Sequence, residues 1–139
     1  MTLIYIYWIS TALLCTLYLA SAGSYIAKRE WAAKAIAELG YPRYLVALLA
    51  AAKILAVVAI LTRWNAGLAD LAYAGVLYHL LLSGAAHLGV RKPKAAIPAA
   101  VGLVLLVASF ATQNIARDKV SLYAPMAQNS APVIQRSML

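Results

Sequence analysis

Two ionisable side chains lie deep inside long apolar stretches of the sequence. Lys53 stands near the middle of the run 44–62 (YLVALLAAAKILAVVAILT), in which no other residue is charged. His79 lies about eleven residues into a second apolar run, 68–90. A charged side chain at the centre of a bilayer costs about 2.5 to 3.5 kcal/mol on insertion scales. We therefore expect Lys53 to face the interior of the protein and to have a polar partner there.

The two side chains are expected at similar depth. With a rise of 1.5 Å per residue, Lys53 lies about 12 Å and His79 about 16 Å from the loop that joins their helices. The first apolar run brings Thr11, Cys15 and Thr16 to a similar level. A neutral imidazole can accept a hydrogen bond from an ammonium group. These residues predict a polar pocket near the membrane midplane. The alternative is that Lys53 and His79 are structural, each bonded to a neighbouring hydroxyl or carbonyl.

Two further polar residues are interpreted as structural. Asp70 begins the third apolar run, where an anion near a helix N-terminus is favourable. The alternative is a partly buried pair with Lys53, although the lysine leans away from Asp70 toward its own N-terminus. His87 lies near the other end of that run, close to Arg91 and the headgroups. About 12 Å separates His87 from His79, so they cannot ligate opposite faces of one haem. A haem bound by a single histidine has no other support in the sequence.

The single cysteine, Cys15, limits the chemistry of the chain. Electron transfer from a dithiol to a quinone needs at least a pair of cysteines, so the chain cannot perform it alone. The sequence also lacks serine-nucleophile motifs, nucleotide-binding glycine loops and metal-spaced clusters of histidine, cysteine and acidic residues. We therefore predict neither a metal site nor an autonomous enzyme.

Helices in a membrane must position these side chains. Of the 139 residues, 65% are apolar and only 12% are charged, far from soluble averages. Four apolar runs can each cross about 30 Å of hydrocarbon as a helix, and their continuity excludes barrel strands, which alternate. The predicted fold is all-α, a transmembrane antiparallel four-helix bundle over residues 1–115. Its helices are expected at about 3–27, 44–61, 68–90 and 95–115, with an interfacial helix at about 30–39 and a mobile polar tail over 116–139.

The basic residues that give the chain its net charge of +8 lie mostly near the ends of these helices. Most of the cations fall in the first and third loops: Lys28, Arg29, Lys34, Arg43, Arg91, Lys92 and Lys94. The positive-inside rule then predicts that these loops are cytoplasmic, in a bacterial-type plasma membrane, and that the cations meet anionic headgroups. Tyrosine and tryptophan near the helix ends, Tyr25 among them, are read as an aromatic belt. Without a basic face interleaved with aromatic residues, nucleic acid is not an expected partner.

One half of the chain resembles a known family. The segment LGYPRYLVALLAAAKILAVVAIL, a short turn and LADLAYAGVLYHLLLSGAAHL are similar to the DoxX-like family of small four-helix membrane proteins in their YP-x-YL, central lysine and AYAG elements. The wider family includes the membrane subunit of a thiosulfate:quinone oxidoreductase, members linked to redox-stress complexes, and relatives that help ion-channel subunits assemble. The chain departs from the family pattern at Asp70, where glutamate is common, and at His79, near a position that is often acidic.

Two functions from different classes remain open on the sequence. The first is a redox-associated membrane subunit whose pocket binds a quinone-like lipid, with Lys53 and His79 donating hydrogen bonds to a carbonyl oxygen and with Tyr73 and Tyr78 flanking the ring. The second is a non-enzymatic assembly factor or interaction protein that binds partner helices, or a second copy of the chain, through faces of small residues.

Overall fold

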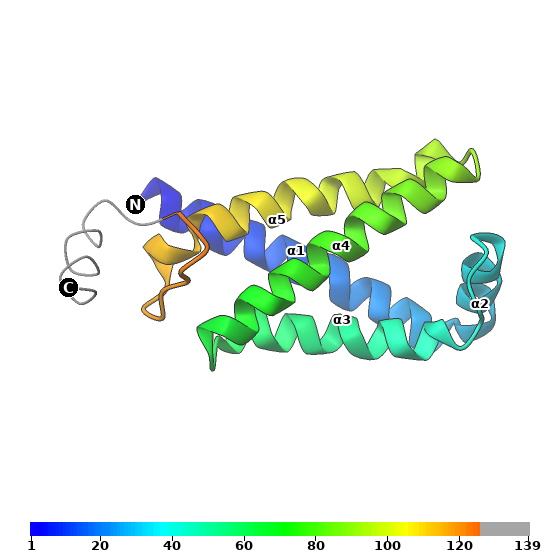
Figure 1. The fold of residues 1–139 in the computed structure, drawn as a ribbon, viewed down its shortest axis with the longest axis horizontal. Helices are drawn as coiled ribbons and strands as arrows, with labels where there is room; N and C mark the ends of the chain where they lie inside the picture. Colours follow the sequence, from blue (N-terminus) through cyan, green and yellow to red (C-terminus); the bar gives the residue numbers. More distant parts are fainter. Residues whose placement is uncertain (126–139) are drawn as a thin grey trace.

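The computed structural model describes residues 1–125 and consists of helices (Figure 1). The all-α fold class is confirmed, since no strand occurs within the described residues. The observed ends differ from the expected ones by at most two residues. The elements are α1 (Thr2–Ala27), α2 (Arg29–Glu38), α3 (Leu45–Thr62), α4 (Ala66–Gly89), the 3-10 turn η1 (Pro93–Ala96) and α5 (Ile97–Ala116).

The four long helices form a closed ring. Helix α1 packs against α3 and α5, and α4 packs against the same two helices, so α1 and α4 face each other across the bundle. Figure 1 shows the N-terminus, the α3–α4 turn and residues 117–125 at one end, which we call the N-terminal end. Helix α2 and the turn between α4 and η1 lie at the other end, the α2 end. This arrangement places the first and third loops on the same side.

Buried residues follow a regular spacing along the helices. In α3 they alternate at steps of four and three: Val46, Ala50, Lys53, Val57 and Ile60. In α5 the same spacing includes Ala99, Gly102, Leu106, Ser109 and Gln113. This is the period of helices that pack at a small crossing angle. The spacing explains why Lys53 points inward, because it occupies the buried seam of its helix.

The turn between α3 and α4 sets the relative depth of their side chains. Arg63 ends α3 in the left-handed conformation, with φ of 45°. Asn65 then caps α4, because its side-chain oxygen accepts hydrogen bonds from the amides of Gly67 at 2.7 Å and Leu68 at 3.2 Å. So short a turn makes the two helices antiparallel neighbours.

Part of the segment expected to be a mobile tail packs against the bundle. Ser121 is fully buried, its amide donates to Asn114 Oδ1 at 2.7 Å, and Asn114 Nδ2 donates to the Ser121 carbonyl at 2.8 Å. Residues 117–125 therefore cover the N-terminal end of the bundle, because a buried amide at the end of α5 pairs with their backbone. The rest of the expected tail, 126–139, lies outside the described residues.

Candidate functional site

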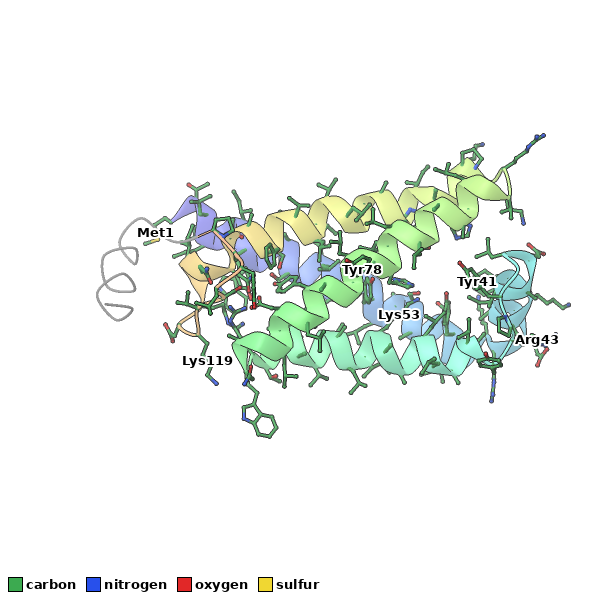
Figure 2. All side chains as sticks on the ribbon, viewed as in Figure 1. Met1, Tyr41, Arg43, Lys53, Tyr78 and Lys119 are labelled. Atoms are coloured by element: carbon green, nitrogen blue, oxygen red, sulfur yellow. The ribbon has the colours of Figure 1, made fainter. Side chains whose placement is uncertain are left out.

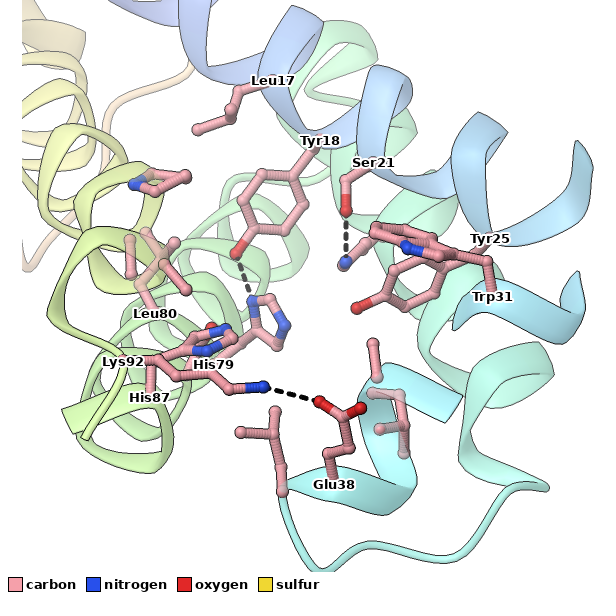
Figure 3. A pocket seen from close by; sticks show the side chains of 18 of the residues that line it. Leu17, Tyr18, Ser21, Tyr25, Trp31, Glu38, His79, Leu80, His87 and Lys92 are labelled. Carbon is pink, nitrogen blue, oxygen red and sulfur yellow. Dashed lines mark hydrogen bonds and ion pairs between the residues drawn. The ribbon is translucent and has the colours of Figure 1, made fainter. Parts of the chain in front are cut away.

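A cavity of about 660 Å³ lies between α1, α2, α4 and the start of α5, on the α2 side of the bundle (Figure 3). Its walls combine polar side chains with aromatic rings from α1, α2 and α4. The polar and aromatic side chains that line it are Tyr18, Ser21, Tyr25, Trp31, Lys34, Glu38, Lys53, His79, Ser83, His87 and Lys92. The volume lies within the range of sites that bind small molecules.

Lys53 is 4% exposed and has neutral partners. Its ammonium donates to Ser21 Oγ at 2.7 Å and lies 4.0 Å from the centroid of the Tyr25 ring. Both partners come from α1, across the α1–α3 interface. Among the described residues, the two ion pairs within 4.0 Å do not include this lysine. The charge is thus stabilised by a hydroxyl dipole and a ring face, without a counter-ion.

His79 has a fixed orientation in the cavity. Its Nδ1 lies 2.8 Å from the Tyr18 hydroxyl, and the two rings meet edge to face with centroids 5.6 Å apart. The same hydroxyl lies 3.5 Å from the Val76 carbonyl, at the limit of a hydrogen bond. We therefore assign the Tyr18 hydroxyl as the hydrogen-bond donor and Nδ1 of the imidazole as the acceptor. In this tautomer Nε2 carries a proton and can act as a donor.

The sequence placed Lys53 and His79 in one pocket but did not identify their partners. The two residues line the same cavity, yet each bonds to α1, Lys53 to Ser21 and His79 to Tyr18. Tyr25 was read as an interfacial aromatic, and Tyr18 and Ser21 were not singled out. Positions 18, 21 and 25 continue the spacing of 11 and 14 on the buried side of α1. That spacing is the signal that could have found them.

Four other predicted site residues lie away from the cavity. Tyr78 is 66% exposed and projects from α4, which Figure 2 shows. Cys15 is buried among core residues. Thr11 Oγ1 and the Tyr73 hydroxyl both contact Ser109 Oγ, at 2.6 Å and 2.7 Å, in a separate polar cluster nearer the N-terminal end. Neither Tyr73 nor Tyr78, predicted to flank a ring beside Lys53, lines the cavity that contains this lysine.

Asp70 and His87 also fall in different places. Asp70 lines a groove of about 580 Å³ between α4 and α5, which does not include Lys53. His87 lines the cavity, close to its opening at the α2 end, and its Nδ1 is buried without a hydrogen-bond partner among the described residues. His87 thus lies in the last turn of α4, and its ring also lines the cavity.

A surface ion pair connects the two sides of the cavity opening. Lys92 Nζ lies 2.6 Å from Glu38 Oε2, which links the end of α2 to the turn after α4 (Figure 3). The hydrogen bond from Lys92, and secondly its charge, lower the pKa of the Glu38 carboxyl. Both side chains are more than half exposed, so the pair contributes little to stability. The pair spans the opening between the end of α2 and the turn after α4.

A second, apolar groove meets the cavity at its polar residues. This groove, of about 590 Å³, runs between α3 and α4 and is lined mainly by aliphatic side chains. Tyr18, Lys53 and His79 line both the groove and the cavity. These three residues therefore form the boundary between a polar chamber and a groove on the outer, apolar surface of the bundle.

The Ser21–Lys53 hydrogen bond gives a first testable prediction. Replacing Ser21 by alanine leaves the buried ammonium without its hydroxyl partner, so the free energy of unfolding should fall by about 1.5 to 3 kcal/mol. Ser24→Ala is the matched control, since the Ser24 hydroxyl is exposed and bonds to its own helix, and it should change stability by less than about 0.5 kcal/mol. Denaturation in detergent micelles measures both. Equal effects of the two variants would contradict the assignment.

The four long segments define the class of protein. Each of Thr2–Ala27, Leu45–Thr62, Ala66–Gly89 and Pro93–Ala116 is long and apolar enough to cross a membrane, and aliphatic side chains cover their outer faces. The chain is an integral membrane protein built as a helical bundle.

Comparison with known families agrees with this architecture. Residues 9–109 match the model of the DoxX-like family, and the chain belongs to that family. Neither the curated proteins nor the solved structures gave a match.

Proposed function

We propose that this protein is a redox-associated membrane subunit that binds a quinone-like lipid. The observation that carries the proposal is the shared boundary of the cavity and the apolar groove, formed by Tyr18, Lys53 and His79. A prenylated quinone has a polar ring and an aliphatic tail, which match a polar chamber joined to an apolar groove.

The polar groups suit a quinone carbonyl. The Lys53 ammonium uses one proton for Ser21 and has others to donate. Nε2 of His79 supplies a second donor, because Nδ1 is engaged by Tyr18. Hydrogen bonds to a carbonyl oxygen strengthen as negative charge develops there, so the pair would favour reduction of the ring. A partner protein would supply the electrons.

The charge of the loops suggests an orientation for the site. The cations of the first and third loops gather at the α2 end, where the cavity opens. By the positive-inside rule, this end faces the cytoplasm. The ring would then be reached from the cytoplasmic side and the tail from the bilayer.

Photolabelling tests the proposal. A quinone analogue with an azide on its ring should label residues of α1 and α4 that line the cavity, at positions 17–25 and 79–87. An excess of unlabelled prenylquinone should remove this labelling, because one site binds both molecules. Peptide mass spectrometry locates the adducts. Labelling spread over the outer faces of all four helices and insensitive to competitor would overturn the proposal.

A further inference from the structure

A second buried polar cluster lies at the N-terminal end, away from the proposed quinone site. Arg63 is 2% exposed; its Nε donates to the Lys119 carbonyl at 2.7 Å, and its Nη1 donates to Gln113 Oε1. Gln113 is fully buried. The cluster is covered by residues 117–125, to which Lys119 belongs. None of the three cavities and grooves described above includes Arg63 or Gln113.

Three buried polar atoms of this cluster have no hydrogen-bond partner among the described residues: Arg63 Nη2, Gln113 Nε2 and the Tyr7 hydroxyl. The Arg63 and Gln113 nitrogens can only donate hydrogen bonds, whereas the Tyr7 hydroxyl can donate as well as accept. The bond from Arg63 to Gln113 Oε1 fixes which side of the amide carries its nitrogen. Buried donors without acceptors are rare in folded proteins and call for a partner.

Helix register brings the three donors together. Helices α1 and α5 are antiparallel neighbours, and Thr11 on α1 contacts Ser109 on α5 at 2.6 Å. One helical turn further toward the N-terminal end, Tyr7 on α1 therefore lies opposite Gln113 on α5. Arg63 joins them from the end of α3 through its bond to Gln113, and both Tyr7 and Arg63 interact electrostatically with the Tyr73 phenol.

The local charge also favours an anion. Arg63 forms no ion pair within 4.0 Å among the described residues, and a buried charge without a counter-charge is costly. Arg117 and Lys119 add two cations at the same end, donating to the carbonyls of Leu61 and Trp64, and the exposed Asp118 lies between them in the chain. The nearest acid along α4, Asp70, lines the α4–α5 groove, and its Oδ1 is buried but accepts no hydrogen bond from the three donors or from any other described residue.

We propose that Arg63 Nη2, Gln113 Nε2 and the Tyr7 hydroxyl form a binding site for one small monovalent anion, of the size of chloride. The three donors come from α3, α5 and α1, so the anion joins three of the four helices at this end of the bundle. The ion supplies both the missing acceptor and the missing negative charge.

Thermal unfolding in detergent tests the site with sodium chloride as the probe. At constant ionic strength, exchanging gluconate for chloride should raise the Tm of the full chain by about 4 °C, with saturation. Tyr7→Phe should raise the half-saturating chloride concentration about tenfold, because one donor is lost. Tyr78→Phe, in which an exposed phenol is removed, should behave like the wild type.

The substitution Gln113→Glu distinguishes a bound anion from other occupants of the site, such as water. The new carboxylate would sit beside Arg63 and replace the ion, so the variant should be as stable in gluconate as the wild type is in chloride, with no chloride dependence. Bromide in crystals should give an anomalous peak within hydrogen-bond distance of the three donors. A wild-type Tm that does not respond to chloride, or a water molecule at this place, would overturn the proposal. So would a stabilising Tyr7→Phe, since an unbound hydroxyl costs free energy when buried.

Discussion

Replacing Lys53 by methionine is expected to weaken quinone binding strongly and leave the bundle folded. The lost hydrogen bond from a charged donor is worth about 1.5 to 3 kcal/mol, so affinity should fall about 10- to 100-fold. Stability should stay the same or rise by about 1 kcal/mol, because the neutral side chain avoids the cost of a buried ammonium that has only neutral partners. Native mass spectrometry of protein extracted from membranes measures the bound quinone, and thermal unfolding measures stability.

Lys28→Met is the matched control for this substitution. Lys28 lies exposed in the turn between α1 and α2, so the variant loses the same charge outside the cavity. Its quinone occupancy should equal that of the wild type. If the Lys53 variant keeps its quinone, the ammonium does not bind the ring. If it loses quinone only because it unfolds, Lys53 is structural, as the alternative interpretation of the sequence has it.

The second large effect is expected at Arg63. Its replacement by methionine leaves the buried Gln113 amide oxygen and the Lys119 carbonyl without their donor. Removing one partner from a buried charged network typically costs about 3 to 5 kcal/mol. The variant should therefore unfold at much lower denaturant concentration than the wild type, with residues 117–125 released first, because Arg63 is one of their contacts with the bundle.

Arg43→Met provides the comparison for this prediction. Arg43 forms a surface ion pair with Glu30 at 2.7 Å, in which both side chains are more than half exposed. Such pairs contribute about 0 to 1 kcal/mol. Denaturant titration followed by circular dichroism should separate the two arginine variants clearly. Similar midpoints would show that the buried network does not stabilise the N-terminal end.

The helices could be predicted because each apolar run is long and ends at cations, prolines or a capping residue. The depth of Lys53 and His79 could also be predicted, since a short turn fixes the register of α3 against α4. Their partners could not be derived in the same way, because a hydroxyl in a membrane helix can bond to its own backbone. Ser24 does this, whereas Ser21 bonds across to Lys53.

The positions of Tyr73 and Tyr78 outside the cavity have a geometric cause. Residues five apart in a helix point about 140° away from each other, so they cannot both face one pocket. Tyr73 follows the buried seam of α4, with Ala69, Val76 and Leu80, and Tyr78 falls on the outer face. Helical phase therefore separates the two tyrosines and places Tyr78 outside the cavity.

The buried network at the N-terminal end could not be predicted, because Arg63 and Gln113 are residue types that commonly occur at the ends of membrane helices. In the sequence, Arg63 stands in a short loop and Gln113 near the end of an apolar run. Their burial depends on residues 117–125, whose polar composition suggested a mobile tail. Long-range contacts of this kind, such as Arg63 with Lys119, leave no local pattern in the sequence.

Fluorescence of Trp31 gives the most direct test of the quinone site. Trp31 lines the cavity, and of the three tryptophans it alone does so. In a variant with Trp8→Phe and Trp64→Phe, a short-tailed quinone should quench the remaining fluorescence with saturation, and adding Lys53→Met should raise the half-saturating concentration at least tenfold. Quenching that rises linearly with quinone, equally with and without Lys53, would contradict a quinone site in this cavity.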